Sequence, residues 1–285
     1  ARLETEAKRR SFRTHIFRES DLDIAFYKER VRLFADRRGF GYWSWKPHVI
    51  LKVLESASEN DIFLYVDSGN AIVSSPNPLL VEGIRDEKGV VLFDNSDGAA
   101  PGSRWINRTW TKPQTFALMG CEEPRYLQGP QVNASYIVFR RTEFCRQFFT
   151  EFSAQCARYD LVADPAPDDP LPEDFVEHRH DQSVLSLLAI RHGVRTLRDP
   201  SQWGNARRRE GDYPQVFDHH RRSMASLAKD PRAVSEVRGL DPLREATARL
   251  RALSLSLEAQ RRRYADLLQR YEALRARHPE AGAPD

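Results

Sequence analysis

The end of the chain carries the pattern that most restricts its fold, an alternation of three- and four-residue steps between mainly apolar residues. Positions 243, 246, 250, 253, 257, 260, 264, 267, 271 and 274 are Leu, Ala, Leu, Leu, Leu, Gln, Tyr, Leu, Tyr and Leu. All but Gln260 can pack in the seam of a coiled coil, and a polar residue there can set the register. A lone helix with such a seam is unstable in water, so residues 243–278 are predicted to pair with a second copy or another partner helix.

Residues 1–230 show a different pattern, in which short apolar runs alternate with amphipathic segments. This alternation predicts an α/β domain. The run Ile62–Val66 is almost continuously apolar, which is typical of a strand buried on both faces of a mainly parallel sheet. Further strands are expected at 14–17, 90–93 and 134–139, and helices at 47–57, 144–157 and 182–191. Residues 231–242 are predicted to be a linker and 279–285 a tail.

Composition and charge narrow the function classes. The 285 residues are 40% hydrophobic, enough to bury a core, and the net charge of +3 is too small for a nucleic-acid footprint. The arginine clusters 207–209 and 261–263 lack interleaved aromatic residues, so they suit contact with an anionic membrane surface better than nucleic acid. No apolar stretch approaches the ~20 residues of a membrane span, and no signal peptide is evident. The three cysteines fit free thiols, so we expect a cytoplasmic protein that can touch the inner face of the membrane.

A polar stretch directly follows the apolar run Ile62–Val66. Asp67 comes first, then Ser68, Gly69 and Asn70. In open α/β sheets, ligands bind beyond the carboxyl ends of strands, where a carboxylate can hold a divalent cation that neutralises a diphosphate. Gly69 would let the backbone approach such a ligand closely. The alternative is that Asp67 only starts a turn, as aspartate often does.

Aromatic residues and a lysine cluster at a predicted helix start. They are Tyr42, Trp43, Trp45 and Lys46, and Pro47 suits the first turn of the helix. Helix N-termini favour anions, so Lys46 could contact a phosphate while the aromatic rings stack on a base or a sugar. The alternative is that the tryptophans belong to the core and Lys46 is solvated.

A third polar group precedes the last predicted helix. His178, His180, Asp181 and Gln182 offer imidazole, carboxylate and amide groups, which can bind a metal, transfer a proton or recognise sugar hydroxyls. Alternatively, Asp181 is an ordinary N-cap. Asn133 lies in a further polar stretch, 131–135, ahead of a predicted strand.

In order and approximate distance, four stretches resemble a group of bacterial polysaccharide glycosyltransferases of the capsule and O-antigen type, which have the GT-A fold. These are Arg38–Pro47, Leu64–Gly69, Gln131–Phe139 and Glu177–Leu188, and the resemblance covers roughly residues 1–205. It implies that residues 1–230 form a GT-A-like (Rossmann-like) glycosyltransferase domain. Such a domain would move a sugar from a nucleotide-sugar donor, a UDP-sugar being favoured, to a hydroxyl of a glycan or lipid-linked glycan.

The resemblance also implies residue roles. Asp67 would be the first acid of a metal- and diphosphate-binding motif served by Mn²⁺ or Mg²⁺. Gly69 departs from the pattern because it stands where the second acid is found, and His178, His180 or the pair 219–220 would have to supply a ligand. The implied donor-binding residues are Arg2, Trp43, Trp45, Lys46, Asp67, Ser68, Gly69 and Asn133. The implied catalytic residues are Asp67, His180, Asp181 and Gln182.

Two further expectations follow from the resemblance. The family usually opens with a strand and loop that grip the nucleotide, ahead of a helix with an Arg-Leu pair. Arg2 and Leu3 match that pair, so the sequence is expected to lack the first strand of its domain. The missing second acid also leaves an alternative function, a catalytically degenerate scaffold that oligomerises through its coiled coil.

Overall fold

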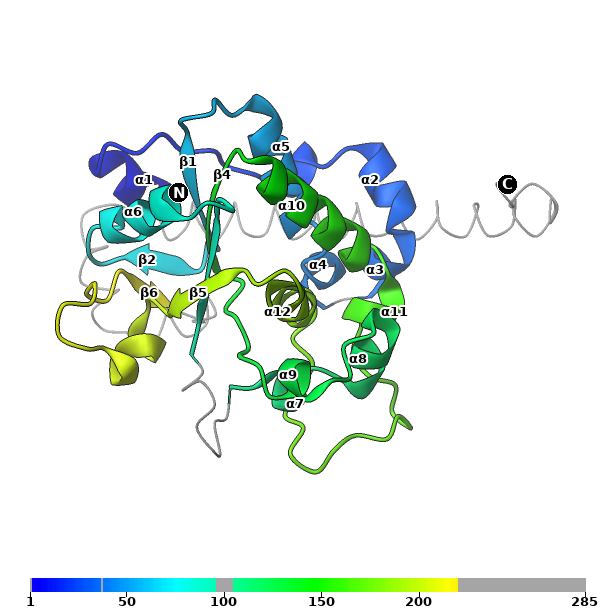
Figure 1. Ribbon diagram of the computed structural model, residues 1–285. Coiled ribbons are helices and arrows are strands. Elements are labelled where there is room, and N and C mark those ends of the chain that lie inside the picture. Colours follow the sequence, from blue (N-terminus) through cyan, green and yellow to red (C-terminus); the bar gives the residue numbers. More distant parts are fainter. Residues whose placement is uncertain (1, 37, 96–104, 220–285) are drawn as a thin grey trace, which may run out of the picture. The chain divides into compact units, whose positions relative to one another are not determined.

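A computed structural model describes residues 2–36, 38–95 and 105–219, which belong to one compact unit, Ala1–His220 (Figure 1). Its helices are α1 (Arg2–Arg9), α2 (Ile24–Glu29), α3 (Val31–Ala35), α4 (Gly39–Tyr42), α5 (Lys46–Ser56), α6 (Asn77–Arg85), α7 (Asn107–Trp110), α8 (Pro113–Met119), α9 (Pro124–Leu127), α10 (Glu143–Cys156), α11 (Tyr159–Val162) and α12 (Asp181–Arg191), with 3₁₀ turns η1 (Glu19–Asp21) and η2 (Gln202–Arg207). Its strands are β1 (Ile62–Val66), β2 (Asn70–Ile72), β3 (Val90–Asp94), β4 (Tyr136–Arg140), β5 (Arg195–Arg198) and β6 (Phe217–His219). The predicted linker, coiled coil and tail, 231–285, lie outside the described residues.

The main sheet has four strands in the order β1-β4-β3-β5, so the α/β class is confirmed. The prediction of a mainly parallel sheet is wrong. Only β3 and β5 pair in parallel, because β4 runs antiparallel to both of its neighbours, β1 and β3. The segment before β4 meets the end of β3, where Asp94 bridges Val132, and β4 therefore starts at that end and runs the opposite way.

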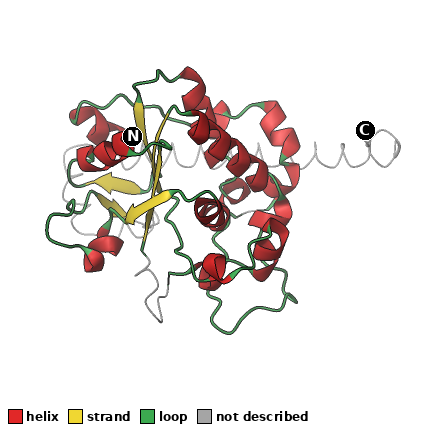
Figure 2. Ribbon diagram, viewed as in Figure 1, coloured by secondary structure: helices red, strands yellow, loops and turns green. Residues whose placement is uncertain are grey.

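Helices cover both faces of the sheet (Figure 2). Helices α5, α10 and α12 pack on one face, against Val90 and Leu92 of β3. The other face carries Val91 and Phe93 and is covered by α6 and the small β2-β6 sheet, whose strands run antiparallel. All five residues of β3 are buried, whereas every residue of β1 is only half-buried. The prediction that Ile62–Val66 is buried on both faces is therefore wrong, since β1 forms an edge of the sheet.

The predicted helices are confirmed by α5, α10 and α12, and their ends show why they form. Pro47 stands in the first turn of α5. The Thr142 hydroxyl accepts a hydrogen bond from the Cys145 backbone N–H at the start of α10. Residues 14–17, predicted as a strand, have no regular structure, while all three cysteines are buried and unpaired, as predicted. No helix in the described part of the chain is long and apolar enough to cross a membrane.

A left-handed turn leads into α5. Gly39, Phe40, Gly41, Tyr42 and Trp43 all have positive φ, from 48° to 70°, and the Trp43 backbone N–H donates to the Gly39 carbonyl. Left-handed backbone costs roughly 1–2 kcal/mol for each residue with a side chain. Several consecutive strained residues are held only where surrounding packing fixes them, and such strain clusters at functional sites.

Gly41→Ala should be more harmful than the same change at Gly120. Both glycines have φ above +60°, but a Cβ at Gly41 would lie 2.6 Å from the Phe34 ring, whereas nothing lies within 4 Å at Gly120. Phe34 is confined by Phe26 and Phe40, so it cannot easily move aside. We expect the free energy of unfolding, measured with urea, to fall by about 2–4 kcal/mol in Gly41→Ala and by about 1 kcal/mol in Gly120→Ala. Equal losses would show that the turn is not tightly packed.

Candidate functional site

An aspartate stands at the carboxyl end of each of the three strands that share one direction. Asp67 follows β1, Asp94 ends β3 and Asp199 comes directly after Arg198 of β5. Because β4 is antiparallel to β1 and β3, its first residue, Tyr136, lies at the same end of the sheet. This end collects acidic and amide side chains from distant parts of the chain, and it is where open α/β sheets bind ligands.

Lys46 is the centre of the first part of this site. Its side chain is 3% exposed, and its Nζ lies 2.8 Å from Asp181 Oδ2 and 3.7 Å from Asp67 Oδ1. The same ammonium donates to the Ala134 carbonyl at 2.9 Å, and the Tyr65 hydroxyl donates to Asp67 Oδ1 at 2.6 Å. Residues predicted separately, Lys46, Asp67 and Asp181, are thus brought together. The burial of Lys46 contradicts the alternative of a solvated lysine.

Two helix N-termini meet at this point. Lys46 is the first residue of α5, and Asp181 is the first residue of α12. The alternative interpretation, in which Asp181 is the N-cap of α12, is therefore wrong. His180 occupies the N-cap position, and the Asp181 carboxylate pairs with Lys46. Gln182, next along α12, accepts a hydrogen bond from the Ala134 backbone N–H. Both helix ends add partial positive charge near the strand end.

Burial sets the protonation behaviour of this cluster. Burial raises the pKa of the Asp181 carboxyl to about 6, against the opposing pull of Lys46. Burial by itself would lower the pKa of Lys46, but the Asp181 and Asp67 carboxylates outweigh it and the pKa is raised. The pKa of the Tyr65 hydroxyl is raised by burial and by the Asp67 charge. Lys46 and Tyr65 therefore keep their protons at neutral pH, while Asp181 titrates close to it.

Asp181→Asn should change how stability depends on pH. The pKa of Asp181 in the folded protein, about 6, lies above its ordinary value of 3.8, so the folded state holds the proton more tightly. The buried carboxylate then costs stability above pH 6, and this cost fades as the pH falls toward 4. As the pH rises from 4.5 to 7.5, the free energy of unfolding of the variant should increase by about 2 kcal/mol relative to that of the wild type. Urea midpoints at both pH values measure this, and parallel pH profiles would contradict it.

A second part of the site is built around Asp199, which the sequence analysis missed. Its carboxylate is fully buried and accepts hydrogen bonds from the side-chain amides of Asn133 (2.7 Å) and Asn95 (3.2 Å). Its other oxygen accepts from the Ser201 backbone N–H and hydroxyl. Asn133, predicted to bind donor, is thus held in place by Asp199. Asp94 is buried as well and pairs with Arg207 at 2.8 Å.

The turn after β1 joins this end of the sheet to α1. Ser68 and Gly69 are exposed, and Asn70 is buried, with its side-chain amide donating to the Asp67 carbonyl. The Tyr136 hydroxyl donates to Asn70 Oδ1 and lies 3.2 Å from His219 Nδ1. The predicted positions 67–70 therefore form one continuous rim, of which Ser68 and Gly69 are open to solvent.

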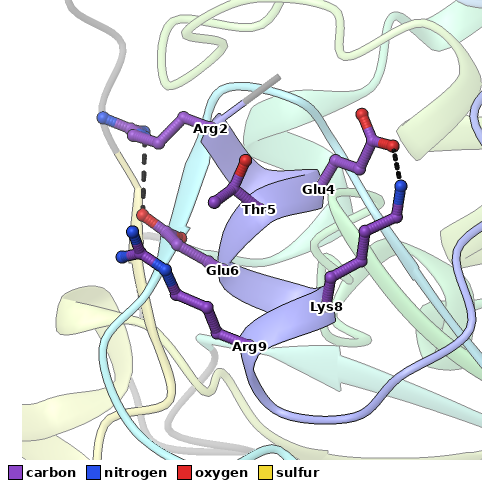
Figure 3. A pocket seen from close by; sticks show the side chains of 6 residues that line it. All are labelled: Arg2, Glu4, Thr5, Glu6, Lys8 and Arg9. Atoms are coloured by element: carbon purple, nitrogen blue, oxygen red, sulfur yellow. Dashed lines mark hydrogen bonds and ion pairs between the residues drawn. The ribbon is translucent and has the colours of Figure 1, made fainter.

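Arg2, another predicted donor-binding residue, lies on the exposed face of α1. Figure 3 shows this face, where Arg2 reaches toward Glu6 and Glu4 pairs with Lys8. The Arg2 guanidinium also donates to the Asn70 carbonyl at 3.2 Å, which links it to the rim after β1. Glu6 accepts a hydrogen bond from the Ile72 backbone N–H. Helix α1 is thus fixed against β2, and Arg2 lies near the rim.

The two predicted histidines are buried, and both ring nitrogens of each are engaged. His180 Nδ1 lies 2.8 Å from the Val162 carbonyl and its Nε2 lies 3.0 Å from Arg38 Nε. His178 Nε2 lies 2.8 Å from the Leu161 carbonyl, and its Nδ1 accepts from the Lys112 backbone N–H. Burial lowers the pKa of both rings. These histidines order the backbone around Asp181.

The two predicted tryptophans pack with different partners. The Trp43 ring packs 5.4 Å from the His180 ring, and His180 itself has a strained φ of 55°. The left-handed turn and the strained histidine therefore support one another beside Asp181. Trp45 packs instead with the apolar cluster of Leu22, Phe26 and Val49. This agrees with the alternative interpretation that this tryptophan belongs to the core.

The predicted divalent cation at Asp67 stays a prediction. Such an ion takes several oxygen or nitrogen ligands, and among residues 2–36, 38–95 and 105–219 no group of three His, Cys, Asp or Glu side chains is placed to hold one. The Lys46 ammonium, 3.7 Å from Asp67 Oδ1, already supplies positive charge there.

Comparison with known proteins gives no match to a protein-family model, to a curated protein or to a solved structure.

Proposed function

We propose that this chain is a glycosyltransferase of the GT-A type, which moves a sugar from a nucleotide-sugar donor to a glycan hydroxyl in bacterial surface polysaccharide synthesis. A UDP-sugar is the favoured donor, and a glycan or lipid-linked glycan is the acceptor. The proposal rests on the resemblance of four separated sequence stretches. It is supported by the fact that key residues of those stretches, Lys46, Asp67, Asp181 and Gln182, gather at one end of the sheet.

One observation carries the proposal furthest. Of the three aspartates at the carboxyl ends of β1, β3 and β5, Asp67 is 29% exposed, and its Oδ2 has no hydrogen-bond partner among the described residues. Asp94 and Asp199 are buried, Asp94 in an ion pair and Asp199 in four hydrogen bonds. A fixed carboxylate with one open oxygen is suited to accept hydrogen bonds from the hydroxyls of a sugar or ribose. Ser68, the next residue along the chain and exposed, can add a polar contact beside it.

The proposed chemistry is a displacement at the anomeric carbon. The acceptor oxygen forms the new glycosidic bond, the bond to the diphosphate breaks with its electron pair, and the hydroxyl proton passes to a base. The buried ammonium of Lys46 and the N-termini of α5 and α12 favour the negative charge that builds up on the departing diphosphate. Asp181 and His180 hold this arrangement in place and are positioning residues.

Donor turnover tests the proposal. The chain is incubated with UDP-, GDP- and CMP-sugars, with and without Mn²⁺ and with a mixture of glycan acceptors, and nucleotide release is followed by chromatography. Release of one nucleotide above the rate of a denatured control supports a glycosyltransferase. The absence of release for every donor, together with binding of a glycan, would instead support the degenerate scaffold.

A further inference from the structure

A buried glutamine without side-chain hydrogen bonds stands at the carboxyl end of the sheet. Gln131 is 3% exposed, and neither its Nε2 nor its Oε1 has a hydrogen-bond partner among the described residues. A buried polar group of this kind has given up its hydrogen bonds to water and gained none in the protein, which costs stability. Such groups are rare in folded proteins, and a bound molecule that supplies the missing partners is one explanation for them.

The strand register places Gln131 beside two asparagines. The bridge between Asp94 and Val132 is antiparallel, so Gln131 stands opposite Asn95, and Asn133 follows Gln131 on the same face of its strand. Residues directly opposite each other have Cβ atoms about 4.5–5.5 Å apart. Asn95 Oδ1 is also buried without a hydrogen-bond partner. Asn95, Gln131 and Asn133 therefore form one amide cluster.

Asp199 holds this amide cluster and gives it its charge. Asp199 Oδ2 accepts hydrogen bonds from the side-chain amides of Asn95 and Asn133, and Oδ1 accepts from the backbone N–H and the hydroxyl of Ser201. Within the described part of the chain, no Lys, Arg or His forms an ion pair with Asp199. The cluster therefore lies beside one buried negative charge that is stabilised by hydrogen bonds.

The unpartnered atoms define the chemistry of a ligand. Gln131 Nε2 needs an acceptor, whereas Gln131 Oε1 and Asn95 Oδ1 need donors. A cation would leave Nε2 without a partner. A phosphate or carboxylate would leave both oxygens without a partner and would be repelled by Asp199. A hydroxyl group both donates and accepts, so adjacent hydroxyls of an uncharged molecule can satisfy all three atoms.

We propose that the amide cluster binds adjacent hydroxyls of one uncharged sugar ring, and that Gln131 is the residue that recognises them. The inference rests on the proposed function, which supplies a sugar as the ligand, and it adds that this sugar carries no acid group. Asn95 and Asn133 are half-buried, so the cluster reaches the protein surface at these two residues. Donor and acceptor both carry a sugar ring, and the experiment distinguishes them.

Sugar binding by two matched variants tests the proposal. Gln131→Met keeps a side chain of similar length but removes both hydrogen-bonding groups. Gln114→Met on α8 is the control, because Gln114 Oε1 is likewise buried without a partner. Glucose, galactose and mannose are titrated into each protein alongside glucuronate and galacturonate, and Kd is measured by saturation-transfer NMR. Wild type and Gln114→Met should bind glucose or galactose at least tenfold more tightly than the matching uronic acid. Gln131→Met should bind that hexose at least tenfold more weakly than the wild type.

The stability of Gln131→Met separates lost binding from lost structure. Because the change removes two buried groups that have no partner, the Tm should rise by about 2–4 °C. The hexose titration is then repeated with saturating UDP and with saturating UDP-sugar. Competition by the UDP-sugar but not by UDP assigns the cluster to the donor sugar, and the absence of competition by either assigns it to the acceptor.

Three results would overturn the proposal: no binding of any hexose, equal affinity for a hexose and its uronic acid, or unchanged binding by Gln131→Met. The last result would assign the unpartnered atoms to bound water. Hexose binding that depends on Gln131, without nucleotide release from any donor, would leave this inference standing and count against a glycosyltransferase. Nucleotide release with the same hexose affinity in Gln131→Met would do the reverse.

Discussion

Sugar transfer should fall by about a hundredfold to a thousandfold in Asp67→Ala, with the fold retained. Asp67 lies at the end of β1 with one carboxylate oxygen open, and in the proposed function it orients the donor. The loss of its hydrogen bond from Tyr65 should cost only about 1 kcal/mol of stability. Asp67→Asn keeps an acceptor for Tyr65 and should be as stable as the wild type while still losing most activity. Nucleotide release and urea unfolding are measured on both variants.

Asp61→Ala provides the matched control. Asp61 has a side-chain exposure of 28%, close to the 29% of Asp67, but it precedes β1 and so lies at the other end of the same strand. Its ion pair with Arg13 is exposed and should contribute little. Transfer by this variant should match the wild type. Full activity of Asp67→Ala, or equal losses at both ends of β1, would contradict the placement of the site.

Lys46→Met should destabilise the protein by about 3–5 kcal/mol, because it leaves the Asp181 carboxylate buried without its partner. The Ala134 carbonyl would also lose its donor. The destabilisation should shrink below pH 6, since protonation of Asp181 removes the unpaired charge, and the pKa of Asp181 is about 6 even with Lys46 present. Urea unfolding of variant and wild type at pH 5 and pH 7.5 measures the difference.

The double variant Lys46→Met/Asp181→Asn should recover most of the lost stability, because neither buried charge remains. Its transfer activity should stay low, since the positive charge behind Asp67 is gone. A double variant no more stable than Lys46→Met alone would show that Lys46 acts through packing and not through its ion pairs. Recovery of transfer activity together with stability would show that the charge of Lys46 has no role in transfer.

The helices were predictable because their signals are local. Pro47 in a first turn and the threonine cap at Thr142 act within a few residues, so α5 and α10 follow directly from the sequence. The direction of β4 was not predictable in this way. It depends on the segment before β4 meeting the end of β3, which the Asp94–Val132 bridge shows and no apolar pattern encodes.

The site residues likewise divide into those marked by a local sequence pattern and those whose role depends on packing between distant segments. Asp67, Lys46 and Asp181 were found because each stands beside a recognisable pattern, but the contacts of Lys46 reach 21 positions along the sequence to Asp67 and 135 positions to Asp181. Asp199 was missed, although a signal existed. Each of the runs 62–66, 90–93 and 195–198 is followed directly by an aspartate, and comparing the three ends would have identified Asp94 and Asp199. The burial of Lys46 and His180 has no such signal, because it arises from packing between distant segments.

Nucleotide binding at the carboxyl end of β1 is the central claim, and a thermal-shift titration tests it most directly. Wild type, Asp67→Asn and Asp61→Ala are titrated with UDP, GDP, CMP and their sugars, with and without Mn²⁺. A ligand that binds only the folded state adds about 2.7 kcal/mol at a hundred times its Kd. We predict a rise in Tm with one nucleotide class for the wild type and Asp61→Ala, and a much weaker rise for Asp67→Asn. The same rise in all three proteins would place the nucleotide elsewhere and contradict the account.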